Sequence, residues 1–328
     1  MKILVLNNAA IEKLLDMSAC IEVMEAALTA LARNQAHNPL RMIVRPPTAK
    51  GLLGLMPAYV EDERAFFGLK AIGVFHQNHV LGKDSHQGIV CLFDGETGEP
   101  LAFMNASAIT AIRTAAVSAV ATKVLARQDA SILAIIGSGV QAASHLAAMC
   151  LVRNLKRVRV ASRNPENAKK FVVRNTAHHS FPIEAVSNAE EAIRDADIIV
   201  TATSSVEPIT RREWIAAGAH INAIGASIPT AREIDSATVA SSKLFVDRRE
   251  SAVNEAGEYL LALRDGAIDP SHIVAEIGEI LIGEKSGRTT PDEITLFKSV
   301  GLAVEDLASA KYLYRRAVEL NEGSWAEF

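Results

Sequence analysis

The sequence predicts an α/β protein in which a Rossmann-type, doubly wound parallel sheet is joined to a second, α+β domain. A short apolar run at 132–136 leads at once into a glycine-rich turn and a helical stretch, the order of a dinucleotide-binding βαβ unit. After this unit, apolar strand patterns alternate with helical ones, as in a parallel sheet. Before it, strand patterns follow one another directly, which indicates a separate domain with an antiparallel sheet.

The N-terminal part of the chain begins with a helix and continues as strands. Asp16 or Ser18 can cap a helix that continues to about Gln35. The turn at 94–98, DGETG, predicts a hairpin between two of the strands that follow. The strand patterns are RMIVR, GLLGLMPAYV, AFFGLKAIGVF, GIVCLF and PLAFMN.

The rest of the chain alternates between helices and strands. An alanine-rich helix at 107–127 leads into the run at 132–136. A helical region is expected at 291–302, and an amphipathic helix at 303–320 is expected to return to the N-terminal domain. The further strands of the parallel sheet are expected at 158–161, 198–202, 220–224 and 243–246. The expected domains are 1–113 with 303–328, for substrate binding and dimerisation, and 114–302, for dinucleotide binding.

Composition excludes several classes of function. The chain has 328 residues, enough for two domains that each bury a core. Hydrophobic residues make up 49%, but no apolar run reaches the ~18 residues of a membrane span. The N-terminus lacks a signal-peptide pattern, and the net charge of −4 is spread along the chain with both signs interspersed. We therefore expect a cytoplasmic protein that binds neither membranes nor nucleic acid.

Cysteines and histidines give no sign of a metal site. Cys20, Cys91 and Cys150 lack the spacing of a disulfide or metal motif. His76 and His79 follow a predicted strand, where a separation of three residues places two side chains on opposite faces. The sequence therefore predicts no metal cofactor and a reducing environment.

The glycine-rich turn predicts binding of a nicotinamide dinucleotide. Gly137 permits the tight turn, Gly139 lets the backbone approach a pyrophosphate, and Ala142 lets the helix pack on the strand. An acid at the end of the second strand normally binds the ribose of NAD, but this chain has Ser162 and Arg163 there. These residues can hold a 2′-phosphate, which favours NADP. If the arginine only stacks on the adenine, NAD would be allowed as well.

Three cations in the first domain are candidates for substrate binding. Arg45, Lys70 and Arg113 stand out, because Lys70 lies in an apolar strand and Arg113 among small or apolar residues of a helix. A cation in apolar surroundings is costly unless it is paired. A substrate carboxylate would be a suitable partner. The alternative is that each cation forms an internal ion pair or extends to the surface.

Taken together, these motifs resemble the ornithine cyclodeaminase/mu-crystallin family over nearly the whole chain. The resemblance implies a substrate-binding and dimerisation domain completed by the C-terminal helix, with a Rossmann domain between. It also implies oxidation of an amino acid at Cα, or reduction of an imine to an amine, with a nicotinamide cofactor. The matching segments are Met56-Pro57, GLKAIGVFHQN, DGETGEPLAF, ITAIRTAA, IGSGVQA, VTATSS, NAIGASIPTAREID and DEITLFKSVGLAVEDLA.

The resemblance implies roles for individual residues. Arg45, Lys70 and Arg113 would grip the substrate carboxylate, and Met56 and Gly301 would also contact the substrate. The implied cofactor-binding residues are Thr110, Gly137, Ser138, Gly139, Val140, Gln141, Ser162, Arg163, Thr203, Ser204 and Gly225.

One segment departs from the cyclodeaminases of this family. Those enzymes resemble GADxPGK after the fifth strand, with a catalytic aspartate third, whereas this chain has serine, Ser227, at that position. A serine hydroxyl is a poor base without an activating partner, which disfavours ring closure of ornithine. Ketimine reductases of the mu-crystallin type resemble the chain more closely here. Glu255 matches a family acid near the substrate and is a candidate replacement, or else a solvated loop acid.

We therefore expect an oxidoreductase that reduces a C=N bond next to a carboxylate, or that runs the reverse reaction as an amino-acid dehydrogenase. The candidate catalytic residues are Lys70, Arg113, Ser227 and Glu255, and Lys70 or a water that it holds would protonate the nitrogen. The expected cofactor is NADP, or else NAD, and the expected partners are a small amino or imino acid and a second copy of the chain. The alternatives are an ornithine-type cyclodeaminase with bound NAD and a non-catalytic protein that binds a small ligand.

Overall fold

The protein consists of two compact units. The computed structural model describes residues 1–61 and 64–328, with the backbone but not the side chains of His76 and His79. Unit 1 comprises Met1–Ala116 and Leu302–Phe328, and unit 2 comprises Val117–Gly301. Each unit is built on its own sheet, and the sheet of unit 2 is parallel, which confirms the α/β fold class.

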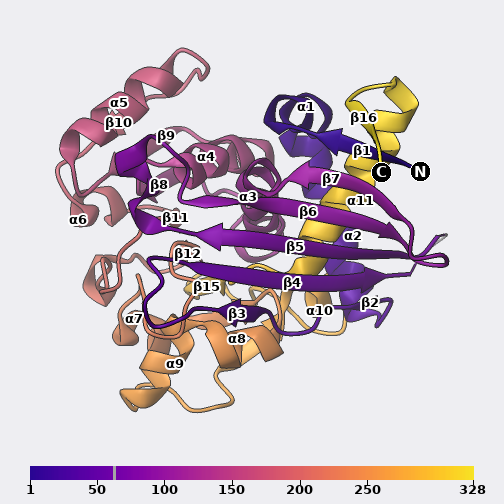
Figure 1. Ribbon diagram of the computed structural model, residues 1–328. Helices are drawn as coiled ribbons and strands as arrows, with labels where there is room; N and C mark the ends of the chain where they lie inside the picture. Colours follow the sequence, from indigo (N-terminus) through magenta and orange to yellow (C-terminus); the bar gives the residue numbers. More distant parts are fainter. Residues whose placement is uncertain (62–63) are drawn as a thin grey trace. The chain divides into compact units, whose positions relative to one another are not determined.

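Unit 1 contains a mixed sheet whose central strands β4 to β7 are antiparallel, as predicted, and lie side by side in Figure 1. Its strands are β1 (Lys2–Leu6), β2 (Ala36–His37), β3 (Met42–Val44), β4 (Leu52–Val60), β5 (Phe66–Val74), β6 (His86–Asp94), β7 (Pro100–Asn105) and β16 (Ser324–Glu327). They follow the order β16-β1-β7-β6-β5-β4-β2, and β3 pairs with β4. Its helices are α1 (Asn8–Leu14), α2 (Met17–Ala32), a 3-10 helix (His76–Leu81), the N-terminal part of α3 (Ala106–Leu125) and α11 (Ala303–Leu320).

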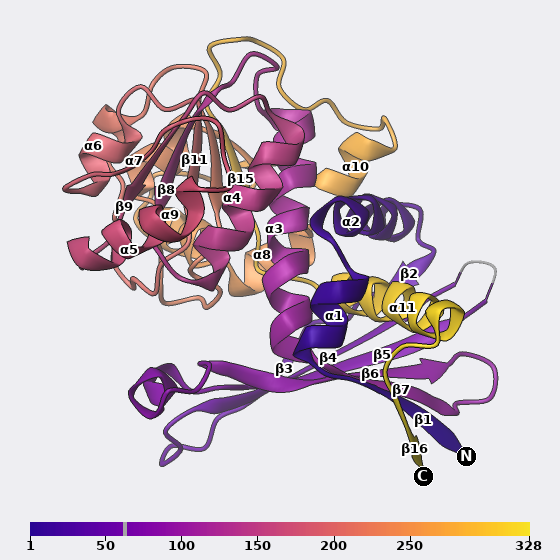
Figure 2. The same cartoon turned by 90° about the horizontal axis from the view of Figure 1, so that it is seen from above.

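Helix α11 covers one face of this sheet, as Figure 2 shows. Gly68 in β5 permits the close approach, because a Cβ there would lie 2.8 Å from Leu307 Cδ1 of α11. Met56 and Lys70 lie directly opposite each other on β4 and β5, so their side chains share the face covered by α11. Alternate residues of the same strands point the other way. Exposed apolar side chains on that side, called the outer face below, are Met42, Val44, Leu53, Phe67 and Ile89.

Short-range signals in unit 1 explain where its elements begin and turn. Asp16 caps α2, because its Oδ1 accepts a hydrogen bond from Ala19 N at 2.8 Å. In the predicted hairpin, Asp94 Oδ1 accepts from Thr97 N at 2.8 Å, and Gly98 has φ of +75°. The turn between β6 and β7 is therefore fixed by its own residues.

Unit 2 contains a parallel sheet in the order β10-β9-β8-β11-β12-β15-β13-β14. The strands are β8 (Ile132–Ile136), β9 (Arg157–Ala161), β10 (Ile183–Ala185), β11 (Ile198–Thr201), β12 (His220–Ala223), β13 (Lys243–Val246), β14 (Ile273–Glu276) and β15 (Thr295–Lys298). Its helices are the C-terminal part of α3, then α4 (Val140–Val152), α5 (Pro165–Thr176), α6 (Ala189–Ile193), a 3-10 helix (Arg212–Trp214), α7 (Ser236–Ser241), α8 (Arg249–Glu255), α9 (Gly257–Arg264) and α10 (Ile277–Leu281). The strands β10-β9-β8-β11-β12 follow the order of a Rossmann fold, in which successive strands are added on one side of β8 and then, from β11 onward, on its other side.

The prediction of a helical region at 291–302 is wrong, because Thr295–Lys298 forms strand β15. This strand is inserted between β12 and β13 and is buried along its length. A short run that is buried on all sides lacks the period of either a strand or a helix, so its pattern is ambiguous. The sequence interpretation also missed β1 and β16, which pair with each other from opposite ends of the chain.

Helix α3 is long and apolar enough to pass a length-and-composition test for a membrane span, contrary to the expectation that no run does. However, 72% of its most apolar window is buried inside the protein. Arg153 hydrogen-bonds the carbonyl oxygens of Thr122 and Ala126, each at 2.8 Å, where the helix ends. Helix α3 therefore resembles a core helix whose C-terminus is capped by a buried cation.

Candidate active site

The glycine-rich turn lies between β8 and α4, at the carboxyl edge of the unit 2 sheet. Gly137 has φ of +125°, and a Cβ there would lie 2.4 Å from the Ala202 carbonyl oxygen, so only glycine fits. At Gly139, the N-cap of α4, a Cβ would meet nothing within 4 Å. Val140 beside it is 64% exposed. Space is thus open beside the first turn of α4, where the N–H groups of a helix N-terminus could bind the pyrophosphate of a dinucleotide.

The end of β9 adjoins this turn. Ser138 Oγ donates a hydrogen bond to Ser162 Oγ at 3.0 Å, which joins the glycine turn to the residue after β9. Arg163 follows with an exposed side chain, and Asn164 caps α5 by accepting from Glu166 N at 3.0 Å. The edge that would face the adenosine ribose therefore carries hydroxyl groups and a cation. Gln141, the second residue of α4, is half-buried behind the turn.

The ends of β11 and β12 meet at the same edge. Thr203 is half-buried and Ser204 is exposed in the segment after β11, and Gly225 lies just after β12. The two segments are joined by one buried carboxylate, because Thr203 N donates to Glu233 Oε1 and Gly225 N to Glu233 Oε2, both at 2.7 Å. Glu233 is not among the site residues predicted from the sequence.

In unit 1, the structure brings Lys70 and Arg113 together at a pair of acids on α11. Lys70 Nζ lies 2.6 Å from Asp306 Oδ2, and Arg113 Nε donates to Asp306 Oδ1 at 3.1 Å. Arg113 Nη1 also donates to Glu305 Oε2 at 2.9 Å. Lys70, Arg113, Glu305 and Asp306 are between 0% and 4% exposed. Met56 adjoins Lys70 across the strands and is also buried.

Burial and charge shift the pKa values in this cluster. Burial, opposed by the charge of Asp306 and assisted by the nearby Arg113, lowers the pKa of Lys70 to about 8. Burial alone would raise the pKa of Asp306, but Arg113 and Lys70 outweigh burial and hold it below its usual range. Asp306 is therefore ionised at neutral pH, and Lys70 can change its protonation state slightly above neutrality.

The internal ion pair that the sequence left open as an alternative is therefore present for Lys70 and Arg113. Arg45 follows β3 with an exposed side chain, so it is not part of the buried cluster. The acids of the cluster were missed, although Glu305 and Asp306 stand between apolar residues of an amphipathic helix. An acidic pair on the apolar face of a helix was the signal that could have indicated them.

The remaining candidates occupy separate places. In unit 2, Ser227 is exposed in the segment after β12, and Glu255 is the half-buried last residue of α8 rather than a loop residue. Gly301 has φ of +79°, and its N–H donates to Asp247 Oδ2 at 2.9 Å. In unit 1, Thr110 is half-buried on α3, three residues before Arg113.

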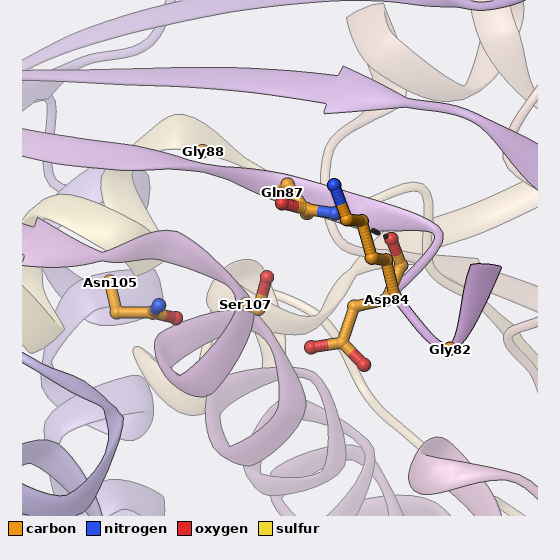
Figure 3. Close-up of a pocket in the computed structure, with 7 residues that line it drawn as sticks. Gly82, Asp84, Gln87, Gly88, Asn105 and Ser107 are labelled. Atoms are coloured by element: carbon orange, nitrogen blue, oxygen red, sulfur yellow. Dashed lines mark hydrogen bonds between the residues drawn. The ribbon is translucent and has the colours of Figure 1, made fainter. Parts of the chain in front are cut away.

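Unit 1 also has an open cavity of about 400 Å³ near the start of α3 (Figure 3). Asn105 Oδ1 accepts a hydrogen bond from Ala108 N at 3.0 Å and so caps this helix. Among the residues whose side chains the structure describes, none of the candidates from the sequence lines the cavity. Its lining residues are Gly82, Lys83, Asp84, Gln87, Gly88, Asn105 and Ser107.

Within the described residues, no three histidine, cysteine or acidic side chains are grouped so that they can hold a metal ion. His76 and His79 begin and continue a 3-10 helix instead of ending a strand. Their side chains lie outside the described residues, so the expectation about them stays a prediction.

Comparison with known proteins agrees with this architecture. The family model described as "Ornithine cyclodeaminase/mu-crystallin family" matches residues 1–321. The chain is 40% identical over 326 residues to a Delta(1)-pyrroline-2-carboxylate reductase of Bacillus cereus, covering 99% of this chain and 100% of the relative. It is similar to the solved Delta(1)-pyrroline-2-carboxylate reductase of Thermococcus litoralis in complex with NADH and L-proline, with 43% identity, a TM-score of 0.95, and coverage of 98% of this chain and 99% of that one.

An archaeal alanine dehydrogenase dimer with bound NAD is similar along its whole length, with 35% identity, a TM-score of 0.94 and coverage of 100% of both chains. These matches run through both units rather than through the Rossmann unit alone. With the glycine turn in unit 2 and the buried cations in unit 1, they show that the chain belongs to the ornithine cyclodeaminase/mu-crystallin family.

Proposed function

We propose that this protein reduces a small α-imino acid to the corresponding amino acid with a nicotinamide cofactor. The preferred substrate class is a cyclic imine that carries a carboxylate, such as Δ1-pyrroline-2-carboxylate. The observation that carries the proposal is the buried pair of Lys70 and Arg113, held by α11 on the covered face of the unit 1 sheet. The similarity to pyrroline-2-carboxylate reductases supports the same substrate class.

The cations of this pair suit a carboxylate that lies next to a C=N bond. An ammonium has three N–H groups and a guanidinium has five, so each cation can contact a substrate while keeping its partner on α11. Arg113 would bind the carboxylate, and Lys70, with a pKa of about 8, would donate a proton to the imine nitrogen. When bound, NADH or NADPH supplies the hydride for the imine carbon. Arg45, Met56 and Gly301 remain proposed substrate contacts.

Proposed cofactor contacts lie along the carboxyl edge of the unit 2 sheet. The N–H groups at the start of α4 would bind the pyrophosphate, with Gly137, Ser138, Gly139, Val140 and Gln141 forming the turn. The segments after β11 and β12, including Thr203, Ser204 and Gly225, would contact the nicotinamide half, and Thr110 of unit 1 would be a further contact.

We further propose that NADPH is preferred over NADH. Support comes from Ser162 and the exposed Arg163 after β9, where a carboxylate for the ribose of NAD would otherwise stand. Against this, NADH or NAD is the cofactor in the similar pyrroline-2-carboxylate reductase and alanine dehydrogenase. Direct titration with both cofactors tests this preference.

The reverse reaction, dehydrogenation of an amino acid, is the second candidate because an alanine dehydrogenase is similar along the whole chain. Ornithine cyclisation is disfavoured, since Ser227 stands where a catalytic carboxylate is expected and is exposed. A neutral hydroxyl contributes only about 1 kcal/mol through one hydrogen bond, so Ser227→Ala is expected to lower imine reduction modestly. Glu255 is the proposed substitute acid.

A substrate panel tests the proposed function. NADPH and NADH are each mixed with Δ1-pyrroline-2-carboxylate, its six-membered homologue, or pyruvate with ammonia, and the nicotinamide absorbance is followed. L-Proline and L-alanine with the oxidised cofactors test the reverse direction. Lys70→Met is the matched negative control, expected to bind cofactor normally and to lose turnover. Cofactor binding without turnover on any member of the panel would favour a binding protein instead.

We also propose that the protein is a homodimer joined through the outer face of unit 1. Five apolar residues that are 42% to 61% exposed form this face, and an apolar surface of this kind is typical of an interface. The similar alanine dehydrogenase is a dimer. Phe67→Lys is expected to yield a monomer in sedimentation equilibrium, whereas the control Val173→Lys, at an exposed apolar site on α5, stays dimeric.

The free thiols Cys20, Cys91 and Cys150 support a reducing, cytoplasmic location, which cell fractionation would test.

A further inference from the structure

The segments that follow β11 and β12 meet at Glu233, a carboxylate that is 0% exposed. Its Oε1 accepts hydrogen bonds from Thr203 N at 2.7 Å and Thr203 Oγ1 at 2.6 Å. Its Oε2 accepts from Thr201 Oγ1 at 2.8 Å and Gly225 N at 2.7 Å. Both carboxylate oxygens are thus used to hold the strand ends together.

Gly225 is tightly packed where the segments after β11 and β12 meet. A Cβ at Gly225 would lie 2.2 Å from the Thr203 carbonyl oxygen and 2.6 Å from Glu233 Oε1. The segment after β12 therefore packs directly on the segment after β11, with the carboxylate at their contact. A shift in Glu233 must move one segment or both.

The backbone of Glu233 is held by Glu258, which forms a buried ion pair with Lys298. Glu233 N donates to Glu258 Oε1 at 2.9 Å, and Glu258 Oε2 lies 2.9 Å from Lys298 Nζ. Lys298 also donates to the carbonyl oxygens of Ala223 and Ala226, at the end of β12 and in the segment after it. Glu258 and Lys298 are each 0% exposed. The segment that carries Ser227 is therefore anchored from Glu233 on one side and from Lys298 on the other.

Burial of Glu233, Glu258 and Lys298 costs desolvation free energy, which the contacts within this network must offset. Burial raises the pKa of Glu233, while hydrogen bonds from Thr203 and Thr201 and the charge of Lys298 favour the carboxylate form. A neutral amide could not accept from backbone N–H groups on both sides, because one side would present an NH2 group. The carboxylate is therefore the group that can fix two backbone N–H groups at once.

We propose that Glu233, supported by Glu258 and Lys298, is a positioning residue that fixes the nicotinamide half of the cofactor site without touching the cofactor. This inference rests on the proposed function and deepens it. The glycine turn at the start of α4, which would hold the pyrophosphate, makes none of these contacts with Glu233, although Gly137 lies against Ala202 next to Thr203. Loss of the carboxylate should therefore affect the nicotinamide half more than the ADP-ribose half.

The test compares binding of NADH with binding of ADP-ribose, which lacks the nicotinamide, by calorimetry on the full chain. We expect Glu233→Gln to weaken NADH about tenfold, as for the loss of one charged hydrogen bond, and ADP-ribose less than about twofold. The matched control is Asp197→Asn. Asp197 accepts from Ser131 N at 2.8 Å and Ile132 N at 2.9 Å at the opposite edge of the same sheet, so this variant should leave the ratio of the two affinities unchanged.

A gentler pair of variants keeps the test decisive if Glu233→Gln does not fold. Thr201→Val removes one donor to Glu233 and should weaken NADH selectively by about threefold, whereas Thr201→Ser keeps the hydroxyl and should restore normal binding. Equal losses for NADH and ADP-ribose, or no loss for either, would show a merely structural role and overturn the inference. If the unaltered protein binds ADP-ribose but not NADH or NADPH, both the inference and the proposed function fail.

Discussion

Lys70 on β5 and Asp306 on α11 form an ion pair of 2.6 Å between side chains that are 3% and 1% exposed. The pair links a strand near the middle of the unit 1 sheet to a helix from the other end of the chain. Because Arg113 shares the same carboxylate, Asp306 holds both cations that are proposed to bind the substrate. The C-terminal helix is thus part of the construction of the candidate site.

Asp306→Asn is expected to destabilise the protein by about 3–5 kcal/mol, because it leaves buried cations without their shared counter-charge. Urea unfolding at neutral pH measures the free energy of unfolding. The control Glu166→Gln removes an exposed pair with Lys169, whose side chains are both 64% exposed, and should change stability far less. Similar values for the two variants would mean that the buried pair adds no more than a surface pair.

Imine reduction should lose rate as pH rises through about 8, where Lys70 gives up its proton. Below this pKa the ammonium form of Lys70 is present and can donate a proton to the imine nitrogen, whereas the neutral amine above it cannot serve as that acid. The profile of kcat/KM against pH measures this loss. In Lys70→Arg the guanidinium stays charged, so the loss near pH 8 should disappear from any activity that remains. A variant with the unaltered profile would assign the pKa to another group.

Gly139→Ala is expected to fold normally and to bind cofactor at least tenfold more weakly. The new Cβ meets no protein atom within 4 Å, and φ of −87° suits alanine, but the methyl group fills the space where the pyrophosphate would approach. Thermal unfolding without ligand and titration with NADPH measure the two effects. Gly137→Ala is the contrast, because φ of +125° and the Ala202 oxygen make it destabilising without any ligand. Normal cofactor affinity in Gly139→Ala would remove the turn from the site.

Arg163→Ala should weaken NADPH by roughly 10- to 100-fold and NADH much less, since only NADPH carries the 2′-phosphate. Direct titration of both cofactors gives the two ratios. An equal change for both would mean that the arginine stacks on the adenine, and the proposed preference for NADPH would be lost.

Local patterns were enough to predict many elements, because their signals lie within a few residues. The sequence places the helix 303–320 at the bounds of α11, and the strand 132–136 at the bounds of β8. Strand β15 escaped prediction because its place between β12 and β13 is a matter of tertiary packing. Pairing of β1 with β16 joins residues at opposite ends of the chain, which no window of sequence contains.

The candidate site shows the same division between local and long-range information. A glycine turn is a local motif, so the residues of the turn between β8 and α4 could be predicted individually. Lys70 and Arg113 could be singled out as cations in apolar surroundings, but their partners lie more than 190 positions away along the chain. Nothing in the neighbouring sequence distinguishes Glu233 from other acids. Its contacts with Thr203 and Gly225 form only because the ends of β11 and β12 are adjacent in the folded sheet.

The reaction expected of this chain is reduction of an α-imino acid and not cyclisation of ornithine. Its most direct test is to incubate the purified protein with NADPH or NADH and Δ1-pyrroline-2-carboxylate, and separately with L-ornithine and NAD, while following nicotinamide absorbance, proline and ammonia. We expect imine-dependent consumption of the reduced cofactor with an equal amount of proline formed, and little or no ammonia from ornithine. Rapid release of ammonia from ornithine without net change in the cofactor, and no consumption with the imine, would contradict it.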